Sequence, residues 1–196
     1  MKVFRWPVVI VVGVAVAAVG LVAGYWDPVD HAAVDARHAA ARIELQADDV
    51  EGRAHGVAEL EQVIKQSPDD QPVVVAELAA FLRTVTGAKD CHPVGRDVQA
   101  VLGVLARRMV GSDRGTALDL HGTCLRNGDM TDISLVQANL VGANLGGANL
   151  TRAILDGADL SGANLSGANL RDAHVVAANL SSANLDGAHT EGLHVA

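Results

Sequence analysis

Aromatic side chains are scarce in this sequence of 196 residues, which holds two Phe, two Trp and one Tyr. Ala, Val and Leu must therefore fill the core, since 49% of the residues are hydrophobic. Basic side chains are also few, because 15 Lys and Arg stand against 23 Asp and Glu, a formal net charge of −8. This balance excludes the dense basic patch that binding to phosphates needs, so we expect no nucleic-acid partner.

Cysteine is nearly absent, and Cys91 and Cys124 are the only two. Two cysteines cannot build a disulfide framework, but a single bridge between them is possible in an oxidising compartment. A zinc site made of Cys91, His92, His121 and Cys124 is the alternative, although these spacings match no standard zinc finger. Neither alternative is decided by the spacing, and we expect no cofactor.

Charge is missing from twenty residues near the N-terminus, from Pro7 to Trp26. As a helix, this run would span the hydrocarbon layer of a bilayer, which is about 30 Å thick, and aromatic residues stand at both of its edges. Lys2 and Arg5 precede the run, so the positive-inside bias places the rest of the chain outside the cytoplasm. The run therefore predicts a single-pass anchor in the cell membrane; a cleaved signal peptide and a buried soluble helix are the alternatives.

Helical periodicity appears in residues 27–115, which we interpret as a small helical domain. Apolar residues recur at helical spacing in three stretches: Val57, Leu60 and Ile64; Val74, Leu78, Phe81 and Val85; Val98, Leu102, Leu105 and Met109. An Ala-rich stretch over 30–49 predicts a fourth helix. Asp70 is a candidate N-cap with Pro72 in the first turn, and Gly111 is expected to close the last helix. No nucleophile, base and orienting group stand together, so we expect no enzyme.

The remaining residues repeat every five positions, as "ANLVGANLGGANL" from Ala138 to Leu150 shows. A helix face recurs at 3.6 residues and a strand face at 2, whereas tandem repetition is typical of a solenoid. The register runs for sixteen units from Leu120 without an insertion. The predicted core consists of Leu140, Leu145, Leu150, Leu155, Leu160, Leu165, Leu170, Leu180 and Leu185, with Ala138, Ala143, Ala148, Ala158, Ala163 and Ala168.

Four such units predict a square coil of twenty residues. Leu and Ala would point inward, Asn and Asp outward, and Gly or Ser would suit the corners. The units "ANLVG", "ANLGG" and "ADLSG" fit the pattern A-(D/N)-L-x-x, and residues 116–196 thereby resemble pentapeptide-repeat proteins. The resemblance implies a right-handed quadrilateral β-helix of about four coils. The predicted anchor and helical lead-in are similar to those of membrane-bound bacterial members, so the expected fold is an α+β solenoid chain with a transmembrane helix at 7–26.

Departures from the repeat mark both ends of the predicted β-helix. The first coil lacks the inner alanine and has Leu118, Thr123, Gly128 and Ile133 instead, so we expect it to be irregular. His174 and His194 lie twenty residues apart and should stack on one outer face beneath Ile154. We interpret them as solvated side chains rather than a metal site, because no third ligand column accompanies them.

The outer surface is the remaining place for function. We expect a non-enzymatic scaffold, tethered to the cell membrane, that presents the β-helix to an unknown protein partner on the extracytoplasmic side. The alternative is a DNA-mimic protein that binds a type II topoisomerase, as some proteins of the resembled family do. Residues 116–196 hold eight acidic and three basic residues, and this net charge of −5 is small for a protein that imitates DNA. The last coil could also join two copies into a homodimer.

Overall fold

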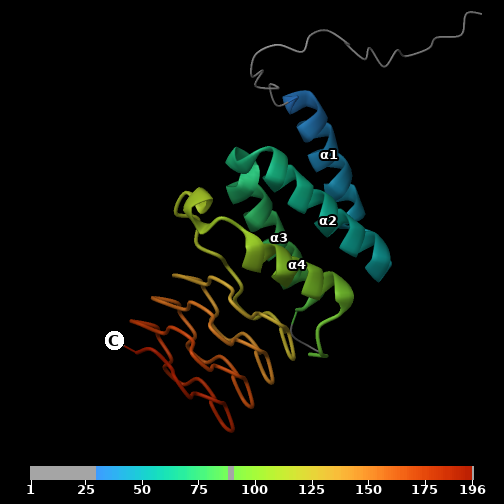
Figure 1. Cartoon of the computed structure of the whole chain (residues 1–196). Helices are drawn as coiled ribbons and strands as arrows, with labels where there is room; N and C mark the ends of the chain where they lie inside the picture. Colours follow the sequence, from blue (N-terminus) through green and yellow to red (C-terminus); the bar gives the residue numbers. More distant parts are fainter. Residues whose placement is uncertain (1–29, 88–90, 196) are drawn as a thin grey trace, which may run out of the picture.

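The computed structural model describes residues 30–87 and 91–195. The predicted membrane span from Pro7 to Trp26 lies outside the described residues. Within the described ranges, no helix is both long and apolar enough to cross a bilayer. Figure 1 shows a group of helices followed by a stack of coils that runs to the C-terminal end.

Within residues 30–87 and 91–115, the helical part holds four α-helices and two short 3₁₀ turns. In chain order they are α1 (His31–Glu44), α2 (Val50–Gln66), η1 (Pro68–Asp70), α3 (Gln71–Val85), α4 (Arg96–Arg107) and η2 (Val110–Asp113). The side chain of Asp30 caps α1 by accepting the Ala33 N–H, and Asp49 caps α2 by accepting the Gly52 N–H. Such caps satisfy N–H groups that a helix start leaves without partners.

Most of the apolar residues that the helical periodicity predicts for the core are buried. The buried apolar faces of α2, α3 and α4 pack together, and α1 packs against α2. The expected extension of the last helix to Gly111 is wrong, because α4 ends at Arg107 and Met109 is 57% exposed. Arg108 leaves the helix with extended backbone, and its guanidinium binds Asp113 and the carbonyl of Ser134. Asp70 occupies the N-cap position of α3 but makes no side-chain cap bond.

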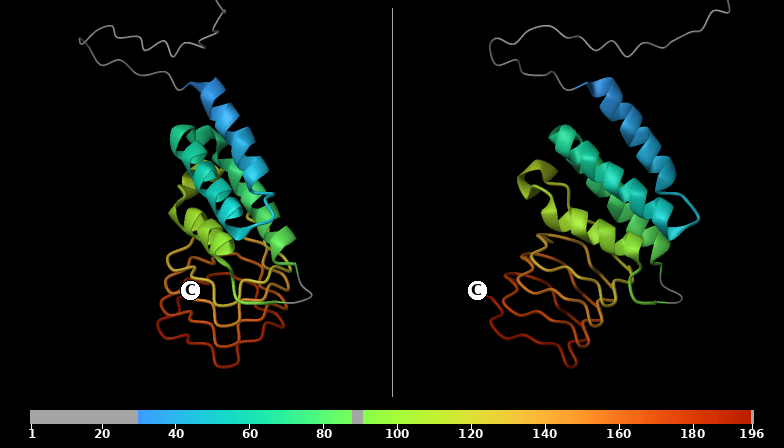
Figure 2. Two further views of the ribbon diagram at one scale, coloured as in Figure 1. Left: turned by 90° about the vertical axis from the view of Figure 1, so that its right-hand side faces the viewer. Right: turned by 45° about the vertical axis from the view of Figure 1, so that its right-hand side comes forward.

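The coils stack in register with a step of twenty residues. Parallel bridges join Asp119 to Asn139, Asn139 to Asp159 and Asp159 to Asn179, and the other three sides repeat the pattern. Each side of a coil contributes a single bridge residue instead of a longer strand, because the corner turns take up the rest of the five-residue unit. Figure 2 shows the resulting four-sided stack with the helices lying over its first coil.

A tight turn forms each corner. At a typical one, the Ala143 N–H donates to the Leu140 carbonyl at 3.0 Å, and Gly142 between them has a φ of 64°. Positive φ recurs at every fifth residue from Gly122 to Gly192. Glycine adopts this conformation without strain, yet seven corners carry another residue: Asn127, Asp132, Gln137, Arg152, Asp172, Ala177 and Ser182.

The central and alanine positions fill the inside of the stack. The predicted core residues from Ala138 to Leu170 are all 3% exposed or less. Leu180 is half-buried and Leu185 is 38% exposed, because they lie in the last described coil and no further coil covers them. A single leucine and a single methyl group per side therefore complete the interior, which explains why the sequence needs no aromatic residues there.

The first coil is regular, so the expectation that it would be irregular is wrong. Its bridges and corner bonds match those of later coils. Helix α4 lies over this coil, and a Cβ on Gly128 would come within 2.9 Å of Leu102 Cδ1, so glycine leaves room for that leucine. The hydroxyl of buried Thr123 donates to the Leu120 carbonyl at 2.7 Å. Packing against the helices thus compensates for the missing alanines.

Candidate functional site

Four outer faces form the candidate functional surface, and each is named here by one of its outward bridge residues. The Asp119 face carries Asp119, Asn139, Asp159 and Asn179; the Cys124 face carries Cys124, Asn144, Asn164 and Asn184; the Asp129 face carries Asp129, Asn149, Asn169 and His189; and the Ile154 face carries Ser134, Ile154, His174 and His194. Asn or Asp thus dominates three faces and is missing from the fourth.

The Asn and Asp side chains bond to the solenoid itself. The Oδ1 of Asn139 accepts the N–H of Val141 at 3.2 Å, and this bond to the residue two positions later recurs at most units of the three faces. The amides also bond along a column, as when Asn164 Nδ2 donates to Asn144 Oδ1 at 3.2 Å. Much of the polar surface is therefore already satisfied within the molecule, which stiffens it.

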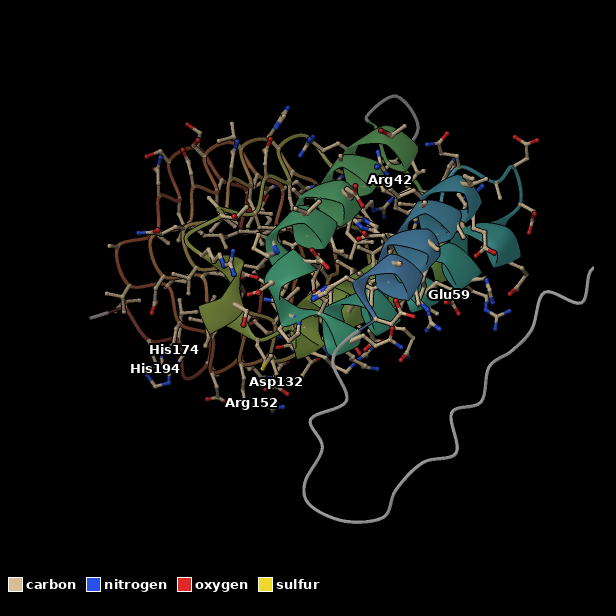
Figure 3. The ribbon with its side chains drawn as sticks, turned by 90° about the horizontal axis from the view of Figure 1, so that it is seen from above. Arg42, Glu59, Asp132, Arg152, His174 and His194 are labelled. Carbon is tan, nitrogen blue, oxygen red and sulfur yellow. A yellow bond between two sulfur atoms is a disulfide. The ribbon has the colours of Figure 1, made fainter. Side chains whose placement is uncertain are left out.

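Ion pairs between successive coils hold the corner beside the Ile154 face. Arg152 binds both carboxylate oxygens of Asp132 at 2.7 Å (Figure 3). Arg171 approaches Glu191 at 3.2 Å. The hydrogen bond from Arg152 holds the pKa of the Asp132 carboxyl below its ordinary value. Burial raises the pKa of Asp119, but hydrogen bonds from His121 and the charge of Arg83 leave that pKa lowered overall.

His174 and His194 stack as the sequence predicts. The two rings lie side by side (Figure 3), with centroids 4.3 Å apart and an interplanar angle of 24°. Ile154 pairs with His174 on the next coil. In residues 30–87 and 91–195, no group of three or more side chains is arranged to hold a metal ion. The two imidazoles form an exposed pair on a flat face.

The helical part covers the first coil on all four sides. Arg83 donates to the Asp119 carbonyl at 2.5 Å, Gln99 bonds both the N–H and the carbonyl of Asp129 at 2.9 Å, and Arg108 donates to the Ser134 carbonyl at 2.9 Å. On the remaining side, Thr86 Oγ1 accepts the Cys124 N–H, and the Val94 N–H donates to the Arg126 carbonyl. An open first coil would leave these groups without partners, so the helices act as its cap.

A disulfide reinforces the Cys124 face of the first coil. Cys91 and Cys124 are bonded, with their Cα atoms 5.4 Å apart, and the bridge ties the connector between α3 and α4 to the first coil. The zinc alternative for these cysteines is wrong, because bonded sulfurs cannot serve as thiolate ligands. His92 lies next to Cys91 in the sequence and His121 lies three residues before Cys124, so neither histidine has a thiolate with which to form a zinc site.

A buried polar cluster at the cap was not predicted from the sequence. Arg108 and Asp113 form an ion pair at 2.9 Å with side chains only 5% and 7% exposed, and Gln71 Nε2 donates to Asp113 at 2.7 Å. Its partners come from α3, from the end of α4 and from η2. Because Gln71 lies 42 residues from Asp113, no local pattern in the sequence could have indicated the cluster.

Charged side chains of the helical part are paired with one another, and two histidines have carboxylate partners: His38 Nε2 lies 2.8 Å from Glu77 Oε2, and His55 Nδ1 lies 2.6 Å from Glu44 Oε2. A hollow of about 640 Å³ between the end of α1 and α3 includes Arg42, Arg53 and Glu77 in its wall. Arg42 is paired with Glu77, and Arg53 with Asp97, which is buried. Glu59 binds Arg37, whereas Glu61 binds Lys65 and Arg107. Most of these ion pairs join two different helices.

Part of the coils is similar to known proteins. Residues 133–172 match the family model for pentapeptide repeats with eight copies. Similar solved structures include a pentapeptide repeat protein, Rfr23, from the cyanobacterium Cyanothece 51142, with 34% identity over 41% of this chain and 52% of that chain, at a TM-score of 0.28. Another is a pentapeptide repeat protein of the Arabidopsis thaliana thylakoid lumen, with 32% identity over 38% and 59% of the two chains and a TM-score of 0.22.

A more distant likeness is QnrB1, a plasmid-mediated fluoroquinolone resistance protein. It is 17% identical, over 39% of this chain and 57% of its own, with a TM-score of 0.15. The chain thus spans between half and three fifths of the length of these three structures. No curated protein matched the chain.

Proposed function

Because this chain carries a pentapeptide-repeat solenoid, we propose that it is a non-enzymatic scaffold, tethered to the cell membrane, whose outer faces bind another protein. The observation that carries the proposal is the structure of those faces. Their side chains are fixed by bonds within and between coils, and the interior of the second and third coils is filled mainly by Leu and Ala. Such a surface is rigid and flat, which suits protein recognition with little ordering cost.

Two observations support a location outside the cytoplasm. The uncharged run from Pro7 to Trp26 follows Lys2 and Arg5, which favours a cytoplasmic N-terminus. The Cys91–Cys124 bridge is of a kind that persists in oxidising compartments and is rare in the cytosol. The two lines of support are independent, since one rests on the anchor sequence and the other on the paired sulfurs.

Photo-crosslinking in intact membranes tests the scaffold role. A photoreactive amino acid is placed on the full-length chain at one outward position of each face, namely 139, 144, 149 or 154. We expect a discrete adduct with one protein from at least one face, and no adduct without irradiation. Absence of any adduct from all four faces would contradict the scaffold.

The DNA-mimic alternative stays a prediction that a gyrase assay can decide. The three basic residues of the solenoid include Arg152 and Arg171, both paired with acidic residues, and the net charge of 116–196 is −5. So few charges give a weak field, so we expect no inhibition of DNA supercoiling by the purified chain. Potent inhibition would favour the alternative. Pairing of two copies through the last coil also stays a prediction, which sedimentation can test.

A further inference from the structure

The Ile154 face departs from the repeat on every coil. Ten of the twelve outward bridge positions on the other three faces are Asn or Asp, whereas this face has Ser134, Ile154, His174 and His194. Elsewhere the Asn or Asp oxygen accepts the corner N–H two residues later, a bond that stabilises the turn. At Ser134, Ile154 and His174 the face residue makes no such bond, which breaks a local rule, and such departures are expected where a protein has a function to serve.

The departure leaves exposed apolar groups and free donors. Ile154 is 37% exposed and Val136, at the adjoining corner, is 42% exposed. Within the described chain, the N–H groups of Val136 and Asp156 have no acceptor, although the corresponding corner groups of the other faces mostly do. The carboxylate of Asp156 is itself occupied, because it accepts the Val176 N–H at 2.9 Å.

We propose that this face, centred on Ile154 with Val136, His174 and His194, is the docking site for a short protein segment that presents an aliphatic side chain beside a carboxylate. The inference rests on the proposed scaffold function and names the face and the chemistry of the partner. The aliphatic group packs on Ile154 and Val136, and the carboxylate accepts hydrogen bonds from the imidazoles and the free corner N–H groups.

The balance of donors and acceptors favours this occupant. An imidazole carries one N–H donor when neutral and two when protonated, and a backbone N–H only donates. Although each neutral imidazole also carries an acceptor nitrogen, the N–H groups of Val136 and Asp156 give the face more donors than acceptors around its apolar centre, and a carboxylate complements that surplus. Arg152 does not compete for the ligand, since Asp132 holds it with two bonds.

The size of the face limits the partner to a short segment. Four coils spaced about 4.8 Å apart give a column roughly 19 Å tall at most, which an extended chain covers with about six residues. A contact of that size is smaller than a stable interface between folded proteins. The scaffold would therefore hold its partner by a linear segment.

The first test measures how far the side chains of the Ile154 face lower the thermal stability of the fold. Replacing Ile154, His174 and His194 together by Asn restores the repeat pattern and should raise the Tm by several degrees. The matched control, Asn144→Ile with Asn164→His on the Cys124 face, should lower the Tm. A restored chain that is no more stable than the original would overturn the inference that these side chains serve something other than folding.

The second test measures binding by the full-length chain in detergent. The probe is the peptide LSESLSE, which in extended form presents Leu and Glu on one side, with LSKSLSK and SSESSSE as controls. We expect NMR shifts at the Ile154 methyl groups and at the His174 and His194 rings with LSESLSE alone, lost in the Asn-restored variant. Equal shifts with LSKSLSK would show that binding needs no carboxylate on the ligand. Equal shifts with SSESSSE would show that binding needs no aliphatic side chain. Either result would overturn the proposed chemistry of the partner.

No shift with any of the three peptides would overturn the docking site while leaving the scaffold role intact. Failure of the scaffold role would instead appear as the absence of photo-crosslinks from all four faces. The two proposals can therefore fail separately.

Discussion

At the scale of single residues, the corner and inward positions make opposite demands on the side chain. Ala177 occupies a corner with a φ of 56°, where a Cβ is strained, whereas Ala173 is fully buried and its methyl group fills the interior. The same residue type is thus unfavourable at one position and required four residues earlier. The five-residue period indicated which alanine points inward, but the strain at Ala177 becomes visible only in the backbone angles.

Ala177→Gly should therefore stabilise the chain by about 0.5–1 kcal/mol, because glycine adopts positive φ freely. Ala173→Gly is the matched control and should destabilise it by roughly 1 kcal/mol or more, since it removes a buried methyl group and loosens the backbone. Denaturant titration of both variants measures the two changes. A loss of stability in Ala177→Gly would show that the corner is not strained.

The Asp132–Arg152 pair gives a prediction about pH. The pKa of Asp132 is lowered in the folded chain, so the contribution of the pair is present above the unfolded pKa and is lost as pH falls through the folded value. Arg152→Gln should raise the pKa of Asp132 towards its ordinary value, as read by NMR titration. Arg171→Gln, which removes the other corner arginine, should leave the pKa of Asp132 unchanged.

At the scale of elements, the helical part caps the first coil of the solenoid, and we call the contact between them the seam. Four sides of the first coil receive bonds from the helices or their connectors, and one side is also bridged by Cys91 and Cys124. Helical periodicity predicted the helices, and the period of five predicted the coils. Neither pattern could predict the seam, because its partners, such as Arg83 and Asp119, lie far apart in sequence and contact each other only in the folded chain.

Loss of the disulfide should lower the stability of the chain. A cross-link that closes a loop of 33 residues contributes about 3–4 kcal/mol on the chain-entropy model. Replacing Cys91 and Cys124 by Ser should lower the free energy of unfolding by up to that amount, and reduction of the original chain should have the same effect. Reductant should have no effect on the double variant; a further loss there would point to another cause.

The buried Arg108–Asp113 pair should be more sensitive than the exposed pairs. Arg108→Ala leaves a buried carboxylate without its partner and frees the Ser134 carbonyl, so we expect a loss of about 3–5 kcal/mol in unfolding free energy. Arg96→Ala breaks the exposed pair with Glu51 and should change stability by about 1 kcal/mol or less. Equal losses in the two variants would show that Arg108 has no special role in the cap.

At the scale of the whole molecule, the described residues combine a helical cap with a solenoid, and the sequence predicts an anchor before them. The sequence predicted the stack of coils and the pairing of His174 with His194, because a strict period fixes which residues lie above one another. It failed at the first coil, where packing by Leu102 replaced the missing alanine at Gly128. It also failed at the end of α4, where the bonds of Arg108 overrode the helical spacing that reaches Met109.

We propose above all that the solenoid is displayed outside the cytoplasm on a membrane anchor. The most direct measurement places one free cysteine at the outward position 164 in a chain whose Cys91 and Cys124 are replaced by Ser. A membrane-impermeant maleimide is then added to intact cells. The account predicts labelling without lysis and recovery of the labelled chain in the membrane fraction. Labelling only after lysis, or recovery of the chain in the soluble fraction, would contradict it.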